Sequence, residues 1–310
     1  MNKIITTTTI NPPTAAMREY DRMDGWELVV VGDERTPPYK LARGTYISWE
    51  EQQAKYPKLC ALLGPGSVQR GRMIAFIEAW KRGAEVMASV DDDCYPLEGW
   101  GGALRIGDRE RVTMHQVDEV AFDPYSALGK TVRHVRHRGY PRELAQTYDH
   151  DCEKWDVFLS PLVQENISVG DPDIDAIDRL SRRTKMTGIG PDPWCSHSFC
   201  PINTQNTFFA REAIPDFYGN IPGIGRMDDI WAGYLFQAMH PGTVIYASAN
   251  NVQMQNRTLE SMLNDLEQEM FGYRTTMHFL EALCKGVGNA MAWLPDIAKH
   301  AIDLYREEFV

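Results

Sequence analysis

Residues 85–96 read EVMASVDDDCYP, and an apolar run in this stretch leads directly into three consecutive carboxylates. The run Val86–Val90 has the length and composition of a buried strand, and Asp91, Asp92 and Asp93 follow it. Ionised carboxylates at a buried strand end are costly unless a cation or hydrogen-bond donors compensate them. Carboxylate oxygens suit Mg²⁺ or Mn²⁺, which would then also bind the phosphates of a diphosphate. The alternative is a solvated acidic turn that caps a helix.

The first third of the chain alternates predicted strands and helices. β-Branched and apolar runs predict strands at 3–10, 26–31 and 46–48, and apolar residues at helical spacing predict a helix over 72–82. This βαβ order predicts an α/β fold with a mixed, mainly parallel central sheet. Because ligands bind at the carboxyl ends of parallel strands, we expect three loops to converge on one crevice, carrying Asn11, Asp33 and Asp91–Asp93.

A second acidic motif, GIGRMDDIWAGY, occupies residues 223–234. Its glycines form a loop that delivers Asp228 and Asp229 to the start of an apolar helix predicted from Ile230. Carboxylates in a first helical turn are favourable with the helix dipole alone. Beside a nucleotide site, the same pair could bind sugar hydroxyls or act as a general base.

A basic stretch, RHVRHRGYPR at 133–142, stands out in an acidic chain. A charge run of this kind is ordinarily a solvated face. Its arginines, Arg136 and Arg138 among them, could instead bind the phosphates or sugar of an anionic ligand through bidentate hydrogen bonds. The acidic segment 170–175 has the composition of a surface loop or of a lid.

Composition narrows the function classes. The chain has 310 residues and a formal net charge of −11, which argues against general nucleic-acid binding because such binding depends on clustered Lys and Arg. No apolar run is long enough for a membrane span, and the scattered cysteines suit a reducing cytoplasm. We expect a nucleotide-binding domain over 1–255 and a helical appendage over 256–310 packed on it. The sequence leaves a homo-oligomer open.

Five motifs follow one another in the order found in a known family. They are VDDDC at 90–94, FDPY at 122–125, RGYP at 138–141, GDPDIDA at 170–176 and GRMDDIWAG at 225–233. Over roughly residues 85–235 the chain therefore resembles the reversibly glycosylated polypeptides, a family that includes the UDP-arabinopyranose mutases. The first 90 residues and the segment 255–273 look more like the STELLO-type glycosyltransferase-like proteins. Both resemblances imply a GT-A (Rossmann-like) nucleotide-sugar fold.

The resemblance also implies roles for individual residues. Asp91 and Asp93 match the metal-binding acids, with Asp92 between them, and Arg138 matches the arginine that the family glycosylates reversibly. Asp228 and Asp229 match the acidic pair near the sugar. The expected nucleotide-sugar-binding set is Asn11, Asp33, Arg72, Asp91, Asp92, Arg136 and Arg226. One departure concerns the metal, because no histidine in residues 246–251 replaces the family's histidine after the last strand.

The sequence thus predicts a metal-dependent enzyme, with Mn²⁺ or Mg²⁺, acting on a nucleotide sugar that we expect to be UDP-linked. The preferred hypothesis is a mutase that interconverts pyranose and furanose sugars through an adduct on Arg138. An alternative is a glycosyltransferase with the same metal site, whose acceptor is a small molecule, a glycan or a modified nucleic-acid base. A third hypothesis is a binding subunit without catalysis.

Overall fold

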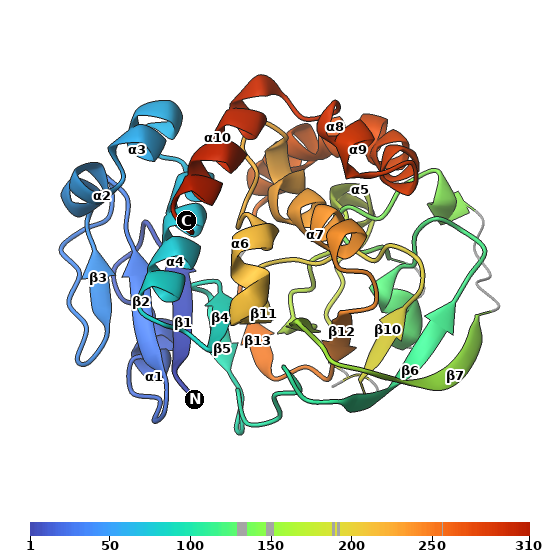
Figure 1. Ribbon diagram of the computed structural model, residues 1–310, viewed down its shortest axis with the longest axis horizontal. Helices are drawn as coiled ribbons and strands as arrows, with labels where there is room; N and C mark the ends of the chain where they lie inside the picture. Colours follow the sequence, from blue (N-terminus) through green and yellow to red (C-terminus); the bar gives the residue numbers. More distant parts are fainter. Residues whose placement is uncertain (129–134, 147–151, 188–189, 191–192, 256) are drawn as a thin grey trace.

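The computed structural model describes residues 1–128, 135–146, 152–187, 190, 193–255 and 257–310. Its described part is built around a ten-stranded sheet (Figure 1). In spatial order the strands are β3 (Thr45–Ile47), β2 (Glu27–Val31), β1 (Lys3–Thr8), β4 (Val86–Val90), β11 (Asn206–Ala210), β8 (Val163–Asn166), β12 (Val244–Ala247), β10 (Trp194–Ser196), β6 (Glu110–Gln116) and β7 (Glu153–Leu159).

The sheet is mixed and mainly parallel, as the sequence predicts. Five of its nine neighbouring strand pairs are parallel, including all three pairs among β3, β2, β1 and β4. The first antiparallel neighbour is β11, which pairs with β4 so that Asn206 lies opposite Val90. The architecture is consistent with a GT-A-like fold, and the strand predicted at 86–90 has the predicted bounds.

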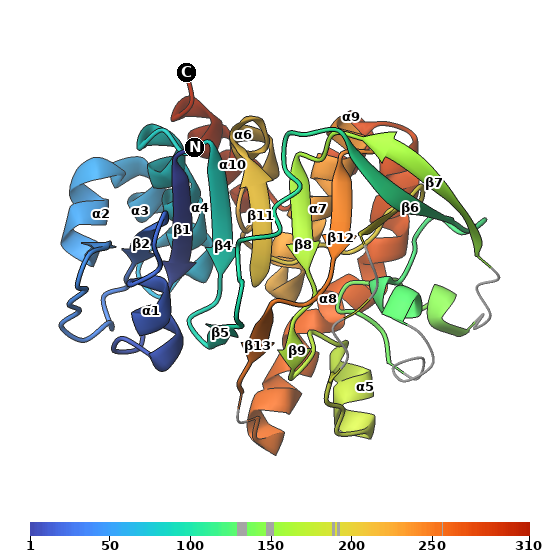
Figure 2. The ribbon, with the colours of Figure 1, turned by 90° about the horizontal axis from the view of Figure 1, so that it is seen from below.

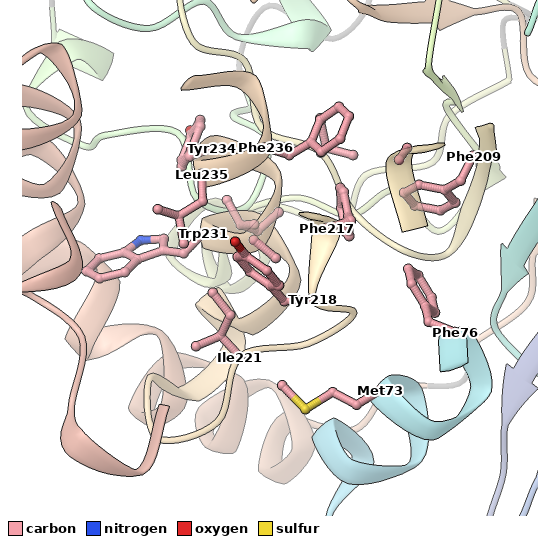
Figure 3. Close-up of a cluster of buried hydrophobic side chains, with 14 of the residues drawn as sticks. Met73, Phe76, Phe209, Phe217, Tyr218, Ile221, Trp231, Tyr234, Leu235 and Phe236 are labelled. Atoms are coloured by element: carbon pink, nitrogen blue, oxygen red, sulfur yellow. The ribbon is translucent and has the colours of Figure 1, made fainter. Parts of the chain in front are cut away.

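Side chains of the parallel strands alternate between two cores, because successive residues of a strand point to opposite faces. Ile4 and Met87 belong to the larger buried cluster, whereas their neighbours Ile5 and Ala88 belong to the smaller one. The helix α1 (Ala15–Tyr20) contributes to the smaller cluster. The remaining long helices contribute to the larger one, whose aromatic centre around Phe76, Phe217 and Trp231 is drawn in Figure 3.

Helix α4 (Val68–Lys81) connects β3 to β4 across the larger core and is buried over most of its length. The side chain of Ser67 caps its first turn by accepting from the amide of Arg70. Gly83, with φ of +77°, follows its end, in agreement with the predicted stop. Before it lie α2 (Trp49–Lys55), which begins with a capping box of Ser48 and Glu51, and α3 (Pro57–Leu63).

The last 50 residues are helical, as the periodicity predicts. They form α8 (Leu259–Cys284), α9 (Val287–Met291) and α10 (Asp296–Glu307). These helices pack against α7 (Asp228–Met239) and α3, and their apolar residues join the large core. The proposed boundary at 255 stays a prediction.

A small three-stranded sheet lies below the lower ends of β4, β11 and β8 (Figure 2). It consists of β5 (Cys94–Pro96), β13 (Asn251–Gln253) and β9 (Val169–Gly170), and α5 (Ala176–Ser181) follows it. The other short elements are η1 (Pro124–Leu128), η3 (Leu144–Gln146), η4 (Arg211–Ala213), α6 (Ile214–Phe217) and η5 (Gly225–Met227). Across the described residues, no helix is both long and apolar enough to cross a bilayer.

Candidate active site

A cavity of about 320 Å³ opens where β1, β2 and β4 end and α4 begins. The structure brings together there three loops that the sequence expects to converge. Its lining includes Asn11, Asp33, Arg72 and Asp91–Asp93 from the predicted set, together with Thr8, Thr9, Gly66, Ser67, Gly71 and Gln255. Gly71 lets the start of α4 approach β1 closely, since a Cβ there would lie 3.0 Å from the Thr8 methyl. We call this space the first cavity.

The three aspartates at the end of β4 have different surroundings. Asp92 accepts a hydrogen bond from Asn11 Nδ2 at 3.0 Å and another from the Thr9 hydroxyl, so it holds the β1 loop. Asp91 accepts from Arg72 Nη2 at 2.6 Å. Burial raises the pKa of Asp91 to about 7, against the attraction of Arg72 and with further repulsion from Asp93. Burial also raises the pKa of Asp93. Burial therefore disfavours the charged forms of Asp91 and Asp93, even though Asp91 is paired with Arg72.

Asp91 and Asp93 fit one side of a divalent-cation site. No group of three or more His, Cys, Asp or Glu side chains suited to a metal is found among the described residues. Mg²⁺ is commonly held by only one or two carboxylates, with waters and substrate phosphates completing its shell. The two acids would hold such a cation together with a diphosphate. Gln255, which follows β13 and lines the cavity, hydrogen-bonds Asp93.

Asp33 has its four acceptor positions filled by the protein. Its Oδ1 accepts from the amide and Nε of Arg35, at 3.3 and 3.2 Å, and its Oδ2 accepts from the amide of Gly66 at 2.7 Å and from Arg70 Nη2 at 3.1 Å. Burial alone would raise the pKa of Asp33, but these donors lower it. Through these hydrogen bonds, Asp33 connects its own loop after β2 to the loop before α4, and both loops line the cavity. The predicted contact with a nucleobase or ribose stays a prediction.

A second cavity, of about 220 Å³, adjoins the first. Both are lined by Val68, Arg72, Asp91 and Gln255, so the first residue of the acidic triplet lies at their junction. The second cavity also brings together Arg138, Arg226, Asp228 and Asp229 from the predicted set. Its remaining lining is rich in amides and hydroxyls, from Gln69, Thr204, Gln205, Asn220 and Gln268. Such groups are suited to hydrogen-bonding a polyhydroxylated ligand.

The two carboxylates of the acidic pair are not equivalent. Asp229 binds Arg138 through both oxygens, at 2.8 and 3.1 Å, and these contacts outweigh burial and lower its pKa. Asp228 instead accepts from two neutral amides, Gln69 Nε2 and Asn220 Nδ2, each at 2.9 Å. Burial and the charge of Asp229 raise the pKa of Asp228 to about 6. Asp228 is thus the member that can take up a proton near neutral pH.

Both acids lie in the first turn of α7, which begins at Asp228, two residues before the predicted start. The favourable interaction with the helix dipole is therefore present in addition to the pocket contacts.

Arg138 lies in the second cavity but is enclosed by partners. Its Nε donates to Asp173 Oδ1 at 2.9 Å, its two terminal nitrogens bind Asp229, and Nη1 also donates to the carbonyl of Arg226. Burial would lower the pKa of Arg138, but Asp173 and Asp229 raise it well above the ordinary value. The structure therefore shows Arg138 as the residue that positions Asp229.

The basic stretch is not a solvated face over its described residues, because 135–141 are buried. Arg133 and His134 lie outside the described residues. Arg136 lines neither cavity; its amide donates to Asp178 Oδ2 at 2.8 Å and its Nε lies 3.7 Å from Asp123 Oδ2. The structure thus does not bring this predicted binding residue to the site. The segment 170–175 is likewise no simple surface loop, since Asp173 and Asp175 are buried.

Arg226 connects the second cavity to α8. Its Nε donates to Glu269 at 3.0 Å and its Nη1 lies 3.2 Å from Asp265. Arg257 binds the other oxygen of Asp265 at 2.6 Å. These ion pairs hold η5, which carries Arg226, against the inner face of α8. Arg226 lines the cavity with its charge already compensated, and its predicted contact with a nucleotide sugar stays a prediction.

Sequence patterns did not identify the polar residues that complete the second cavity, Gln69, Thr204, Gln205, Asn220, Gln255 and Gln268. They are common residues without a shared spacing, and they meet only in the fold. The nearest signal was the helix predicted over 72–82 beside the crevice; in the structure this helix, α4, begins at Val68 and so includes Gln69 in its first turn.

Comparison with known proteins adds one distant relationship. No family model matches the chain. Over 248 residues, 73% of the chain, it is 22% identical to the probable glycosyltransferase STELLO1 of Arabidopsis thaliana and equally to STELLO2 of the same plant. The chain spans about a third of the length of these relatives, 32%. The similarity supports a glycosyltransferase-like family.

Proposed function

We propose that this protein is a metal-dependent glycosyltransferase that takes a sugar from a nucleoside diphosphate sugar. The observation that carries the proposal is the junction of the two cavities at Asp91, Arg72 and Gln255. A diphosphate at this junction would place its nucleoside in the first cavity and its sugar in the second. The similarity to two probable glycosyltransferases supports the same class of donor.

In this proposal the chain's own residues supply positioning and proton transfer. Asp228, buried beside two amides, accepts the proton of an acceptor hydroxyl. The acceptor oxygen then forms a bond to the anomeric carbon while the bond from that carbon to the diphosphate oxygen breaks. A divalent cation held by Asp91 and Asp93 would stabilise the negative charge that develops on the departing diphosphate. Arg138 fixes Asp229, the neighbour that raises the pKa of the base.

The mutase hypothesis needs a nucleophilic Arg138. A guanidinium must lose a proton before it can attack carbon, and the two carboxylates around Arg138 oppose that loss. The Nε and both Nη atoms of Arg138 are also engaged with protein acceptors. We therefore favour transfer to a separate acceptor, and UDP as the nucleotide, which the resemblance to UDP-sugar enzymes suggests.

Incubation of the protein with UDP-sugars and Mn²⁺ or Mg²⁺, resolved by anion-exchange chromatography, tests the proposal. A transferase releases UDP, with a glycosylated product when an acceptor is present, and an Asp91→Asn, Asp93→Asn double variant should do neither. An isomerised donor of unchanged mass, with one sugar mass added to the peptide containing Arg138, would instead establish the mutase. Binding of UDP-sugars without turnover, whichever acceptor is added, would favour the hypothesis of a binding subunit without catalysis.

A further inference from the structure

The first half of helix α8 buries charged side chains, unlike an ordinary surface helix. Its buried face includes the charged residues Asp265 and Glu269, which are 8% and 1% exposed. Its outer face carries Leu259, Leu263 and Met270, which are 64%, 45% and 38% exposed. A surface helix normally buries its apolar stripe and turns its charges to water. The ion pairs with Arg226 and Arg257 explain why charged residues are buried on the inner face. They do not explain why apolar residues are exposed on the outer face.

The exposed apolar residues form a regular spacing together with three half-buried ones, among which the Tyr273 hydroxyl donates to Glu269 at 2.7 Å. Leu259, Leu263, Leu266, Met270, Tyr273 and Met277 are separated by alternating steps of four and three residues. This 3.5-residue repeat is the pattern of a coiled-coil seam. None of the six belongs to a hydrophobic cluster formed by the described residues. Figure 2 shows the first turns of α8 extending below the main sheet beside α5. We call these six residues the α8 seam.

We propose that the α8 seam binds a second copy of this chain, with the two α8 helices antiparallel about a two-fold axis near Gln268. In this register, Leu266 meets Met270 of the partner subunit and Leu263 meets Tyr273 of the partner subunit. Leu259 meets Met277 of the partner subunit in the outermost layer. In each layer an a position of one helix faces a d position of the other, which is the pairing of an antiparallel coiled coil.

The charges beside the seam favour this orientation. The exposed flanking positions are Glu260, Glu267 and Arg274. The antiparallel register places Glu260 opposite Arg274 of the partner subunit, and symmetry forms this ion pair twice. A parallel pair would direct Arg274 toward Glu269, which is 1% exposed and already accepts from Arg226. Glu267 meets its own copy at the axis, which is a repulsive contact; on the other flank Glu269 also approaches its own copy, with its charge compensated by Arg226.

Because the seam is short, we expect a dimer that dissociates on dilution, with a Kd on the order of micromolar, as for other small interfaces. Sedimentation velocity of the full chain from about 1 to about 100 μM measures this. A Leu263→Ser, Met270→Ser variant should remain monomeric throughout the range. Phe158→Ser is the matched control, since Phe158 is 61% exposed on the edge strand β7, away from α8. Circular dichroism verifies that each variant is folded.

Charge reversal tests the register. Glu260→Arg or Arg274→Glu alone should weaken the dimer about tenfold or more, because each loses two ion pairs and creates two repulsions. The double reversal should restore it to within about threefold, and Glu267→Gln should tighten it. Asp303→Arg, on the exposed face of α10, is the charge control. A monomer at every concentration, a dimer that survives the seam variant, or failure of the double reversal to restore association would each overturn the proposal.

Discussion

At the scale of single residues, Asp228 and Asp229 offer the sharpest test, because neighbours in sequence have opposite surroundings. We expect Asp228→Asn to lower turnover by about a hundredfold or more while nucleotide affinity is retained. Since the pKa of Asp228 is about 6, its base form is lost as the pH falls through 6. The wild-type rate should therefore fall about tenfold per pH unit below 6, and the residual rate of the variant should lack this step. Steady-state rates from pH 5 to 8 measure both effects.

Asp229→Asn should act mainly on stability. It removes one of the two carboxylates that bind Arg138 and leaves a buried guanidinium undercompensated. Breaking a buried ion pair in this way costs about 3 to 5 kcal/mol. Urea unfolding should show that loss for Asp229→Asn, and Asp228→Asn should lose much less, because the side chains that bind Asp228 are neutral amides and Asp229 repels its charge. Equal losses in the two variants would contradict the division of roles.

The same pair shows what sequence could and could not provide at this scale. The motif at 223–234 identified both acids and predicted that they lie at the start of a helix. It could not separate their roles, because the separation depends on Arg138, Gln69 and Asn220, which lie 91, 159 and 8 positions away from the acids they bind. Those partners carry no local pattern.

At the scale of elements, the contact between η5 and α8 depends on a glycine. Gly225 has φ of +61°, and a Cβ there would overlap the carbonyl oxygen of Gln268. We expect Gly225→Ala to destabilise the protein by about 2 kcal/mol or more and to displace Arg226. Gly288→Ala in α9 is the control, since no atom lies within 4 Å of the added carbon and alanine favours a helix by about 1 kcal/mol. Thermal unfolding of both variants distinguishes them.

Elements with a strong period were predictable, and those without one were not. The strands β1, β2 and β4 and the helices α4 and α8 follow from apolar spacing and end signals. β13 has only the sequence NVQ and β9 only VG, which are too short and polar to stand out. These two strands form because β5, directly after Asp93, offers β13 a pairing edge, with Gln253 opposite Cys94. The two strands that the sequence did not predict, β13 and β9, therefore depend on pairing between segments that are far apart in the chain.

At the scale of the whole molecule, ligand binding should stabilise the fold in a metal-dependent way. With Mn²⁺ present, UDP at about one hundred times its Kd should add about 2.7 kcal/mol to the free energy of unfolding. EDTA should remove most of that gain, because Asp91 and Asp93 alone leave the metal shell to be completed by phosphate. Differential scanning calorimetry with UDP, with and without EDTA, measures the change, and uridine serves as a control without phosphates. An unchanged gain after EDTA would argue for phosphate binding without metal.

The lining of the second cavity has a practical consequence for anyone wishing to shorten or graft this protein. Its walls come from Gln69 in α4, Thr204 before β11, Asp228 in α7 and Gln268 in α8, so the chain contributes to it from four widely separated places. A fragment ending at residue 255 would lack Arg257 and Gln268 and would leave Arg226 without Asp265 and Glu269. The C-terminal helices belong to the minimal working unit, and a transplanted site would have to carry them along.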